Sequence, residues 1–138
     1  MHWSVYALGA AVSAALVSIF AKIGLKGVDS TLATTIRSIV VATFLVGVAL
    51  SLGKFSGASS LSGKAILFII LSGIAGAVSW LFGFYALKIG PTAGVSAVDR
   101  LSVVFTLVLA ALFLGEAITW KTALGGLFVA IGAMLFVL

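Results

Sequence analysis

Residues 64–87, KAILFIILSGIAGAVSWLFGFYAL, contain no charged side chain after Lys64. A helix rises about 1.5 Å per residue, so about 20 such residues cross the hydrocarbon core of a bilayer. Four other apolar runs of similar length occur in the chain. The five runs cover residues 4–26, 31–52, 64–87, 92–115 and 120–138. The sequence therefore predicts a single all-α integral membrane domain over residues 1–138, with five transmembrane helices.

The composition excludes a water-soluble domain. Of the 138 residues, 63% are hydrophobic and 8% are charged, so too few polar groups remain to cover a surface in water. The net charge of +5 comes from basic residues that are spread singly along the chain, which does not favour nucleic-acid binding. Since the sequence has no cysteine and one histidine, we expect neither a metal site nor a cofactor. The lipid bilayer is the expected surrounding.

Short polar segments supply the ends of the predicted helices. Gly27 is suited to a left-handed stop, and Asp29 or Ser30 can cap the second helix by accepting its free backbone N–H groups. Thr119 is the expected cap of the last helix. Residues 53–63 are rich in Ser and Gly, which predicts a flexible polar loop.

The basic residues between the spans show no orientation bias. The connections after the first and third spans, and those after the second and fourth, carry three lysines each: Lys22, Lys26 and Lys88 against Lys54, Lys64 and Lys121. Basic residues normally accumulate on the cytoplasmic side. We therefore predict that the chain inserts both ways up and forms an antiparallel homodimer of ten helices, with the inverted symmetry of many secondary transporters. The alternative is a fixed orientation that this count misses, for example because Lys22 snorkels from within the first span.

Small residues on the last span predict a helix–helix contact. Glycine and alanine at helical spacing allow two backbones to approach closely. Gly126, Ala130 and Ala133 share one face, and Gly125 and Gly132 lie beside it. We predict that this face forms the dimer interface. The same pattern is also compatible with packing of this helix against its own bundle.

Three charged residues fall inside predicted spans, namely Arg37, Asp99 and Arg100. Each costs about 2.5–3.5 kcal/mol at a helix centre, so each needs a partner or a polar cavity. The second and fourth spans start from the same side of the membrane, and Arg37 and Asp99 both lie about 10 Å deep. We therefore predict an interhelical ion pair between them, which could equally serve only to fix the register of the two helices. Arg100 is left for backbone carbonyls, lipid headgroups or a substrate anion.

Other polar and aromatic residues reach the same depth. Trp80 on the third span lies away from both headgroup layers, and Ser18 on the first span is equally deep. The predicted binding residues are Arg37, Trp80, Asp99 and Arg100, with supporting contacts from Ser18, Ser79 and Tyr85. Because the buried charges sum to +1, the cavity would favour an anionic or zwitterionic solute. Asp99 is the acid that could carry a coupling proton. No set of residues typical of a catalytic site is present, so we do not expect an enzyme.

Several short segments, in this order and spacing, resemble the EamA-like membrane proteins of the drug/metabolite transporter superfamily. They are residues 20–30 (FAKIGLKGVDS), 35–37 (TIR), 79–81 (SWL), 85–90 (YALKIG), 99–102 (DRLS), 114–116 (LGE) and 119–121 (TWK). The likeness spans the whole chain as one EamA unit. It implies a five-helix repeat that larger relatives carry twice, in opposite orientations, around a central substrate cavity.

The resemblance implies a secondary transporter of a small metabolite or drug-like solute that works by alternating access. It also implies a location in the inner membrane of a prokaryotic cell. A single repeat would need a second copy to complete the cavity, as the charge count independently suggests. Two alternatives remain open: a non-transporting scaffold or assembly subunit, and a passive channel for small solutes.

The orientation hypothesis is tested with a reporter protein fused to the C-terminus. We expect the reporter to be found on both sides of the membrane in one population of cells, because the lysines favour neither orientation. Measurement with one reporter active only in the cytoplasm and another active only outside it distinguishes the two positions. A single uniform location would contradict dual insertion.

Overall fold

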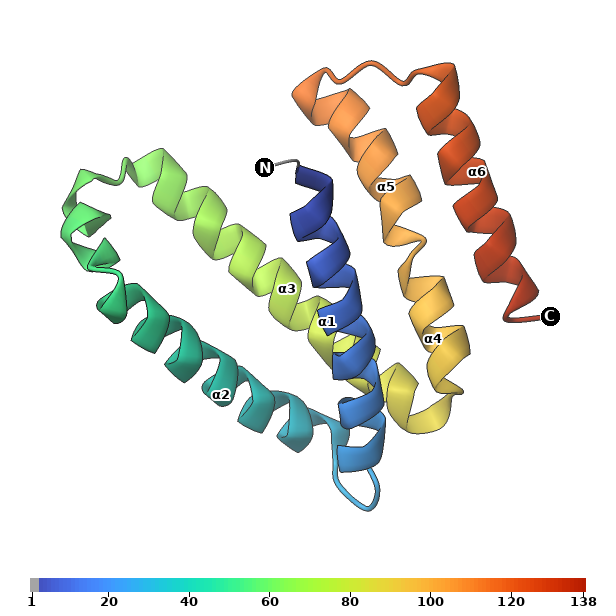
Figure 1. Cartoon of the computed structure of the whole chain (residues 1–138), viewed down its shortest axis with the longest axis horizontal. Coiled ribbons are helices and arrows are strands. Elements are labelled where there is room, and N and C mark those ends of the chain that lie inside the picture. Colours follow the sequence, from blue (N-terminus) through green and yellow to red (C-terminus); the bar gives the residue numbers. More distant parts are fainter. Residues whose placement is uncertain (1–2) are drawn as a thin grey trace. The chain divides into compact units, whose positions relative to one another are not determined.

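The computed structural model describes residues 3–138, apart from the side chains of residues 58 and 59, and the described residues form helices joined by turns (Figure 1). In chain order the helices are α1 (Trp3–Gly24), α2 (Ser30–Ser51), the 3-10 helix η1 (Lys54–Ser60), α3 (Gly63–Ile89), α4 (Thr92–Asp99), α5 (Ser102–Leu109), the π-helical turn η2 (Ala110–Leu114) and α6 (Trp120–Leu135). The structure thus agrees with the predicted all-α class.

Four stretches are long and apolar enough to cross a membrane: α1, α2, α3 and the combined segment Thr92–Leu114. The fifth predicted run forms the shorter apolar helix α6, which ends at Leu135 rather than continuing to residue 138. Its 16 residues rise about 24 Å, somewhat less than the hydrocarbon thickness of about 30 Å. The first three spans begin and end within two residues of the predicted positions.

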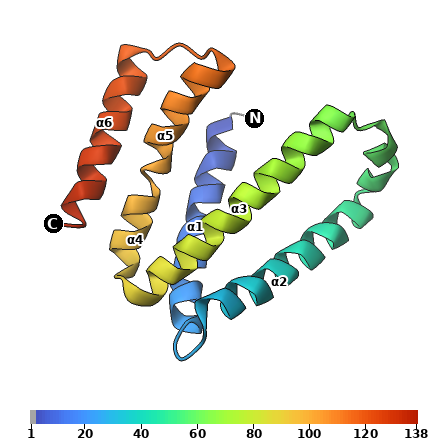
Figure 2. The same cartoon turned by 180° about the vertical axis from the view of Figure 1, so that it is seen from behind.

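The helices group into two compact units. Residues 24–88 form the α2–α3 unit, in which α2 and α3 lie closest where α2 begins and separate towards η1 (Figures 1 and 2). The described residues up to Ile23 and residues 89–138 form the α1/α4–α6 unit. Within that unit α6 returns alongside α4 and α5 and packs against both.

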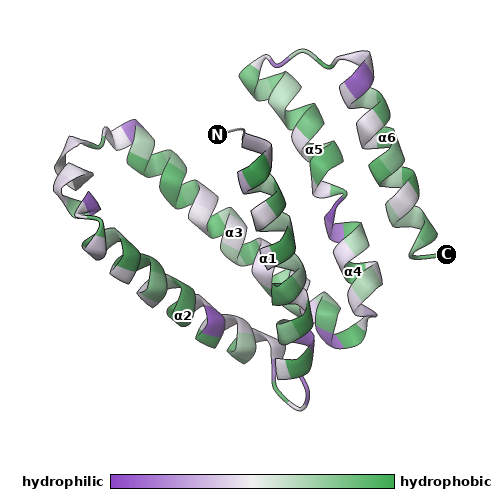
Figure 3. Ribbon diagram, in the orientation of Figure 1, coloured by the Kyte–Doolittle hydropathy of each residue, from purple (hydrophilic) through white to green (hydrophobic). Residues whose placement is uncertain are grey.

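Most residues of the helices are hydrophobic (Figure 3), and many of their large apolar side chains are exposed. Among the described residues, the hydrophobic side chains that are buried are Leu25, Phe84, Leu87 and Ala133. So small a buried set would not hold a domain of this length together in water. The exposed apolar surface instead requires lipid or another protein chain around it, as expected of a membrane protein.

The predicted cap of α2 is confirmed. Asp29 accepts hydrogen bonds from the backbone N–H groups of Thr31 (2.9 Å) and Leu32 (3.0 Å), and Gly27 adopts the left-handed conformation with φ of 73°. The N–H donors, that of Leu32 above all, hold the pKa of the Asp29 carboxyl below its ordinary value. The ionised cap therefore contributes stability above the ordinary carboxyl range, and this contribution is lost as the pH falls through the lowered pKa.

The cap of α6 is also confirmed, and its detail is richer than predicted. The Thr119 hydroxyl accepts from the Thr122 N–H (3.2 Å), and the Thr122 hydroxyl accepts from the Thr119 N–H (3.0 Å). This reciprocal arrangement is a capping box, in which a threonine replaces the usual Glu or Gln. It satisfies two backbone donors that α6 would otherwise leave unpaired.

The loop at residues 53–63 is more ordered than its composition predicts. Lys54–Ser60 form the 3-10 helix η1 instead of a structureless connection. The hydroxyl of Ser56 donates to the Gly53 carbonyl at 2.9 Å, three residues back along the chain. Serine side chains that bond to nearby backbone in this way stabilise tight turns. The same serine content that suggested flexibility therefore helps to order the segment.

Polar side chains join α1 to the start of α4. The Lys22 ammonium donates to the Gly90 carbonyl oxygen at 2.7 Å, across 68 residues of sequence. Ser18 lies one turn before Lys22 on α1, and its hydroxyl accepts a hydrogen bond from the Ser96 hydroxyl at 3.3 Å. The Ser18 hydroxyl in turn donates to the Ala14 carbonyl at 3.1 Å. Gly90 directly follows α3, so Lys22 satisfies a carbonyl at a helix end. These bonds fix the position of α1 within the α1/α4–α6 unit.

We expect Lys22→Met to destabilise the protein, because it removes the ammonium that bonds to the Gly90 carbonyl. A hydrogen bond to a charged group contributes about 1.5–3 kcal/mol, and the free energy of unfolding should fall by about that amount. Denaturant unfolding in detergent micelles measures the change. The matched control is Lys26→Met, which removes an exposed lysine from the turn after α1. Equal losses in the two variants would show that the bond adds no stability.

Candidate functional site

Arg37 and Trp80, two of the residues predicted to bind substrate, lie together in the α2–α3 unit. The Cζ atom of Arg37 lies over the Trp80 ring, 4.1 Å from its centroid. Arg37 is in the second turn of α2 and Trp80 is in the C-terminal half of α3, the region where these two antiparallel helices approach each other (Figure 2). A guanidinium over the face of an indole is a cation–π contact.

Phe84 is a further member of this cluster that the sequence analysis did not identify. Its ring centroid lies 5.6 Å from the Arg37 Cζ atom, and its side chain is buried. Phe84 follows Trp80 by four residues, and side chains at that spacing occupy one face of a helix. The four-residue spacing from Trp80 is the sequence signal from which the position of Phe84 beside Trp80 could have been predicted. The Arg37–Trp80–Phe84 cluster thus contains one cation and two aromatic rings.

One donor of Arg37 has no acceptor. Nη1 is buried and forms no hydrogen bond within the described part of the chain. The hydroxyls of Thr34 and Ser38 donate to the backbone of α2, to the Ser30 and Thr34 carbonyls respectively, both at 2.8 Å, and neither accepts a hydrogen bond from Nη1. The α2–α3 unit contains one acidic residue, Asp29, and its carboxylate caps α2 two turns away. Aromatic rings, rather than a carboxylate, therefore face Arg37 within its own unit.

The energies show that this environment is incomplete for a cation inside a membrane. A desolvated cation–π contact contributes about 2 kcal/mol, whereas an arginine at a span centre costs about 2.5–3.5 kcal/mol on insertion scales. A buried donor without an acceptor costs about 1–3 kcal/mol more. The cluster therefore offsets only part of the cost of placing Arg37 inside a membrane.

Asp99 and Arg100 lie at an interruption of the fourth span, which was predicted as one continuous helix over residues 92–115. The Arg100 and Leu101 N–H groups bond three residues back, to Ala97 (3.1 Å) and Val98 (2.9 Å), instead of four. The span therefore divides into α4 and α5, with a hydrophilic connection between them (Figure 3). Both charged side chains are exposed. The interruption thus places two charged side chains where the regular backbone ladder of the span is broken.

The same span departs from α-helix a second time before it ends. The Gly115 and Glu116 N–H groups both bond to the Ala110 carbonyl, which closes the π turn η2, and Gly115 has φ of 68°. The predicted end near residue 115 is correct. Glycine accommodates this left-handed termination without strain. Wide turns of this kind often occur near functional sites.

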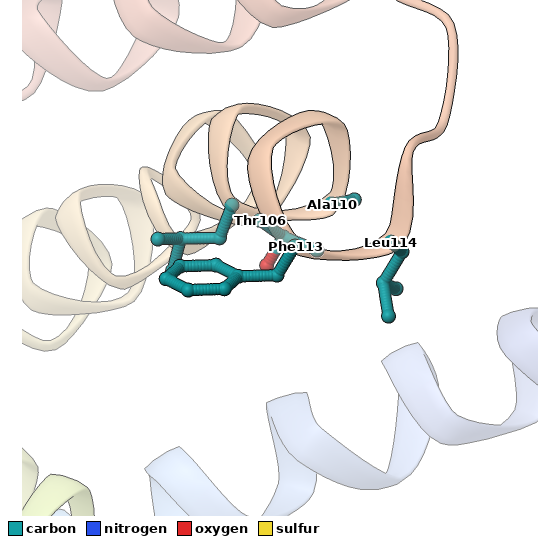
Figure 4. Close-up of a pocket in the computed structure, with 5 residues that line it drawn as sticks. Thr106, Ala110, Phe113 and Leu114 are labelled. Atoms are coloured by element: carbon teal, nitrogen blue, oxygen red, sulfur yellow. The ribbon is translucent and has the colours of Figure 1, made fainter.

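Two open hollows flank α5 and η2. One, of about 280 Å³, is apolar and is lined by Thr106, Leu109, Ala110, Phe113 and Leu114 (Figure 4). The other, of about 310 Å³, has a more polar lining that includes Ser102, Thr106 and Glu116. Neither hollow contains a residue predicted to bind substrate. Their exposed apolar walls suit contact with lipid chains.

The remaining predicted binding residues have separate surroundings. Ser18 bonds to Ser96, as described above, whereas Ser79 and Tyr85 are exposed on α3. Arg37 belongs to the α2–α3 unit and Asp99 to the α1/α4–α6 unit. The ion pair between them therefore stays a prediction.

The small residues of α6 pack in part within the chain. Gly126 and Ala133 are buried, and a Cβ atom added to Gly126 would lie 3.6 Å from Leu107 Cδ2 on α5. Ala130 and Gly132 are half-buried, and Gly125 is exposed. The contacts of Gly126 agree with the alternative use of this face, packing against the chain's own helices. A dimer interface at the exposed part of α6 stays a prediction.

Comparison with known proteins gives a consistent result. The model of the EamA-like transporter family matches residues 1–138. A Sinorhizobium protein described as an uncharacterized transporter in the cobO 3′ region is 39% identical over 133 residues, which cover 96% of this chain and 94% of the relative. No solved structure matches. With its apolar helices and a match over its full length, the chain belongs to the EamA-like transporter family and is integral to a membrane.

Proposed function

We propose that the protein is a secondary transporter that moves a small metabolite or drug-like solute by alternating access. Two copies inserted in opposite orientations form the working unit, an antiparallel homodimer in the inner membrane of a prokaryote. Family membership and the description of the Sinorhizobium relative as a transporter support transport in general. The equal numbers of lysines on the two sides of the membrane support dual insertion.

The observation that carries the proposal is the state of Arg37. A cation in a membrane span rests on aromatic rings, and a buried donor has no acceptor among the described residues. A purely structural arginine would be expected to have a carboxylate partner in its own unit, because an unpaired charge in a membrane is destabilising. Arg37 is better explained as a binding group for an anionic or zwitterionic solute.

The interruption of the fourth span suggests how the other charged residues contribute. In many transporters the binding site is formed where a membrane helix is broken, because the broken ladder exposes polar backbone groups. Asp99 and Arg100 lie at such a break. We assign Arg100 to the solute, and Asp99 to orientation of the two arginines or to a coupling proton.

We expect Arg37→Ala and Asp99→Asn to lose transport while keeping the dimer. A thermal-shift screen against metabolites first identifies a solute that stabilises the purified protein, because ligands that bind the folded state raise its apparent stability. Uptake of that solute into proteoliposomes should fall about tenfold or more in each variant, as expected when an ionic hydrogen bond is lost. Size-exclusion chromatography or crosslinking monitors the dimer.

The control variant is Lys64→Gln, which removes one positive charge at the start of α3 and should retain uptake. Uptake that saturates and is accelerated by solute trapped on the opposite side supports alternating access. Linear uptake without counter-transport would indicate a passive channel. Unchanged uptake in both test variants would remove the assigned site. If the wild-type protein takes up no solute and the two test variants are less stable than the wild type, the protein is a scaffold.

A further inference from the structure

We propose that the Arg37–Trp80–Phe84 cluster recognises the carboxylate of a small organic anion whose body is apolar. This inference rests on the proposed transport function and names the substrate class of the same site.

The sign of the ligand follows from the charges of the α2–α3 unit. Arg37 is the cation in the membrane portion of this unit, and the nearest acid, Asp29, is committed to the N-terminus of α2. Aromatic rings attract a cation without neutralising it. An anion would supply the missing charge, whereas a cationic solute would add a second uncompensated positive charge. The cluster therefore selects against cations.

The shape of the ligand follows from the position of the guanidinium. Its donors lie in one plane, and its Cζ atom lies over the Trp80 ring, 4.1 Å from the ring centroid. Nη1 is buried, but Arg37 as a whole is only partly buried, so part of its side chain can be reached from outside the cluster. A carboxylate fits such a fork with two parallel hydrogen bonds.

A carboxylate also matches the cluster better than a phosphate group does. One guanidinium balances the single charge of a carboxylate. A phosphate dianion would keep an uncompensated negative charge in an environment that disfavours it. The aromatic rings of Trp80 and Phe84 supply an apolar wall beside the charged group, and Phe84 is only 6% exposed. A flat apolar body next to the carboxylate would therefore bury against these rings.

Binding is tested with benzoate and two probes of nearly the same shape, neutral benzamide and cationic benzamidinium. The protein is the full chain in lipid nanodiscs, with Trp3→Phe and Trp120→Phe so that Trp80 is the remaining tryptophan. We expect benzoate to change the Trp80 fluorescence in a saturable way. Benzamide should bind about tenfold more weakly or worse, because it lacks the charge that strengthens hydrogen bonds to Arg37. Benzamidinium should not bind.

Variants separate the planar fork from charge alone. Arg37→Lys keeps the positive charge but loses the paired donors, and it should weaken benzoate binding about tenfold or more. Lys64→Gln removes one positive charge from the start of α3 and should leave benzoate binding unchanged. The comparison of the three probes uses the protein that keeps Arg37, so it decides the inference even if Arg37→Lys does not fold.

Three results would overturn the carboxylate inference: equal binding of benzoate and benzamide, undiminished benzoate binding by Arg37→Lys, or equal losses in Arg37→Lys and Lys64→Gln. Flux measured in proteoliposomes distinguishes this failure from failure of the transporter proposal. If another solute shows saturable uptake but benzoate neither binds nor competes, the transporter stands and the carboxylate site is wrong. If benzoate binds as expected but no solute crosses the membrane, the site stands and transport is wrong.

Discussion

The structure depends on one constraint: inside hydrocarbon, every backbone N–H and C=O group must find its partner within the protein. Helices satisfy this locally, which is why four stretches of this chain form long helices despite having few buried side chains. The same constraint gives meaning to each place where the regular ladder fails. In the fourth span the regular i to i−4 hydrogen-bond ladder is interrupted twice, at residues 99–101 and at the π turn η2. Polar side chains or glycine accompany both places.

The parts of the fold that could be predicted from sequence are those that depend on nearby residues. Span positions follow from the lengths of apolar runs, and the caps at Asp29 and Thr119 follow from side chains that bond two or three residues along the chain. The order within residues 54–60 was missed because composition reports the serine content but not which backbone carbonyl each hydroxyl reaches.

The interruption of the fourth span could not be predicted from the usual helix-breaking residues, since neither glycine nor proline occurs there. Its effect on the site is considerable. Each residue of a 3-10 turn advances about 120° around the axis instead of about 100°. Residues beyond the break, such as Thr106, therefore point in a different direction around the axis than regular helical spacing from Ser96 would give. A prediction of how deep a residue lies in the membrane is little affected by such a break, whereas a prediction of which direction its side chain points around the helix is no longer valid.

Depth counting predicts that Arg37 and Trp80 lie at the same level of the membrane, and the cation–π contact shows that the two side chains are neighbours within the α2–α3 unit. Their role in binding stays a prediction. Phe84 was overlooked because an isolated phenylalanine in an apolar span carries no signal unless its spacing from Trp80 is considered. The predicted ion pair between Arg37 and Asp99 cannot be judged from local sequence patterns in the same way. It depends on how helices from two units meet, which local patterns in a sequence do not encode.

The bond between Lys22 and the Gly90 carbonyl links residues that are 68 positions apart. It can form only after the third helix has been synthesised and inserted. Until then the ammonium of Lys22 is available to the insertion machinery as a topological signal. In the folded protein the same ammonium is bonded to the carbonyl at a helix end. An amine-reactive label should therefore modify Lys22 more slowly in the folded protein than in the nascent chain.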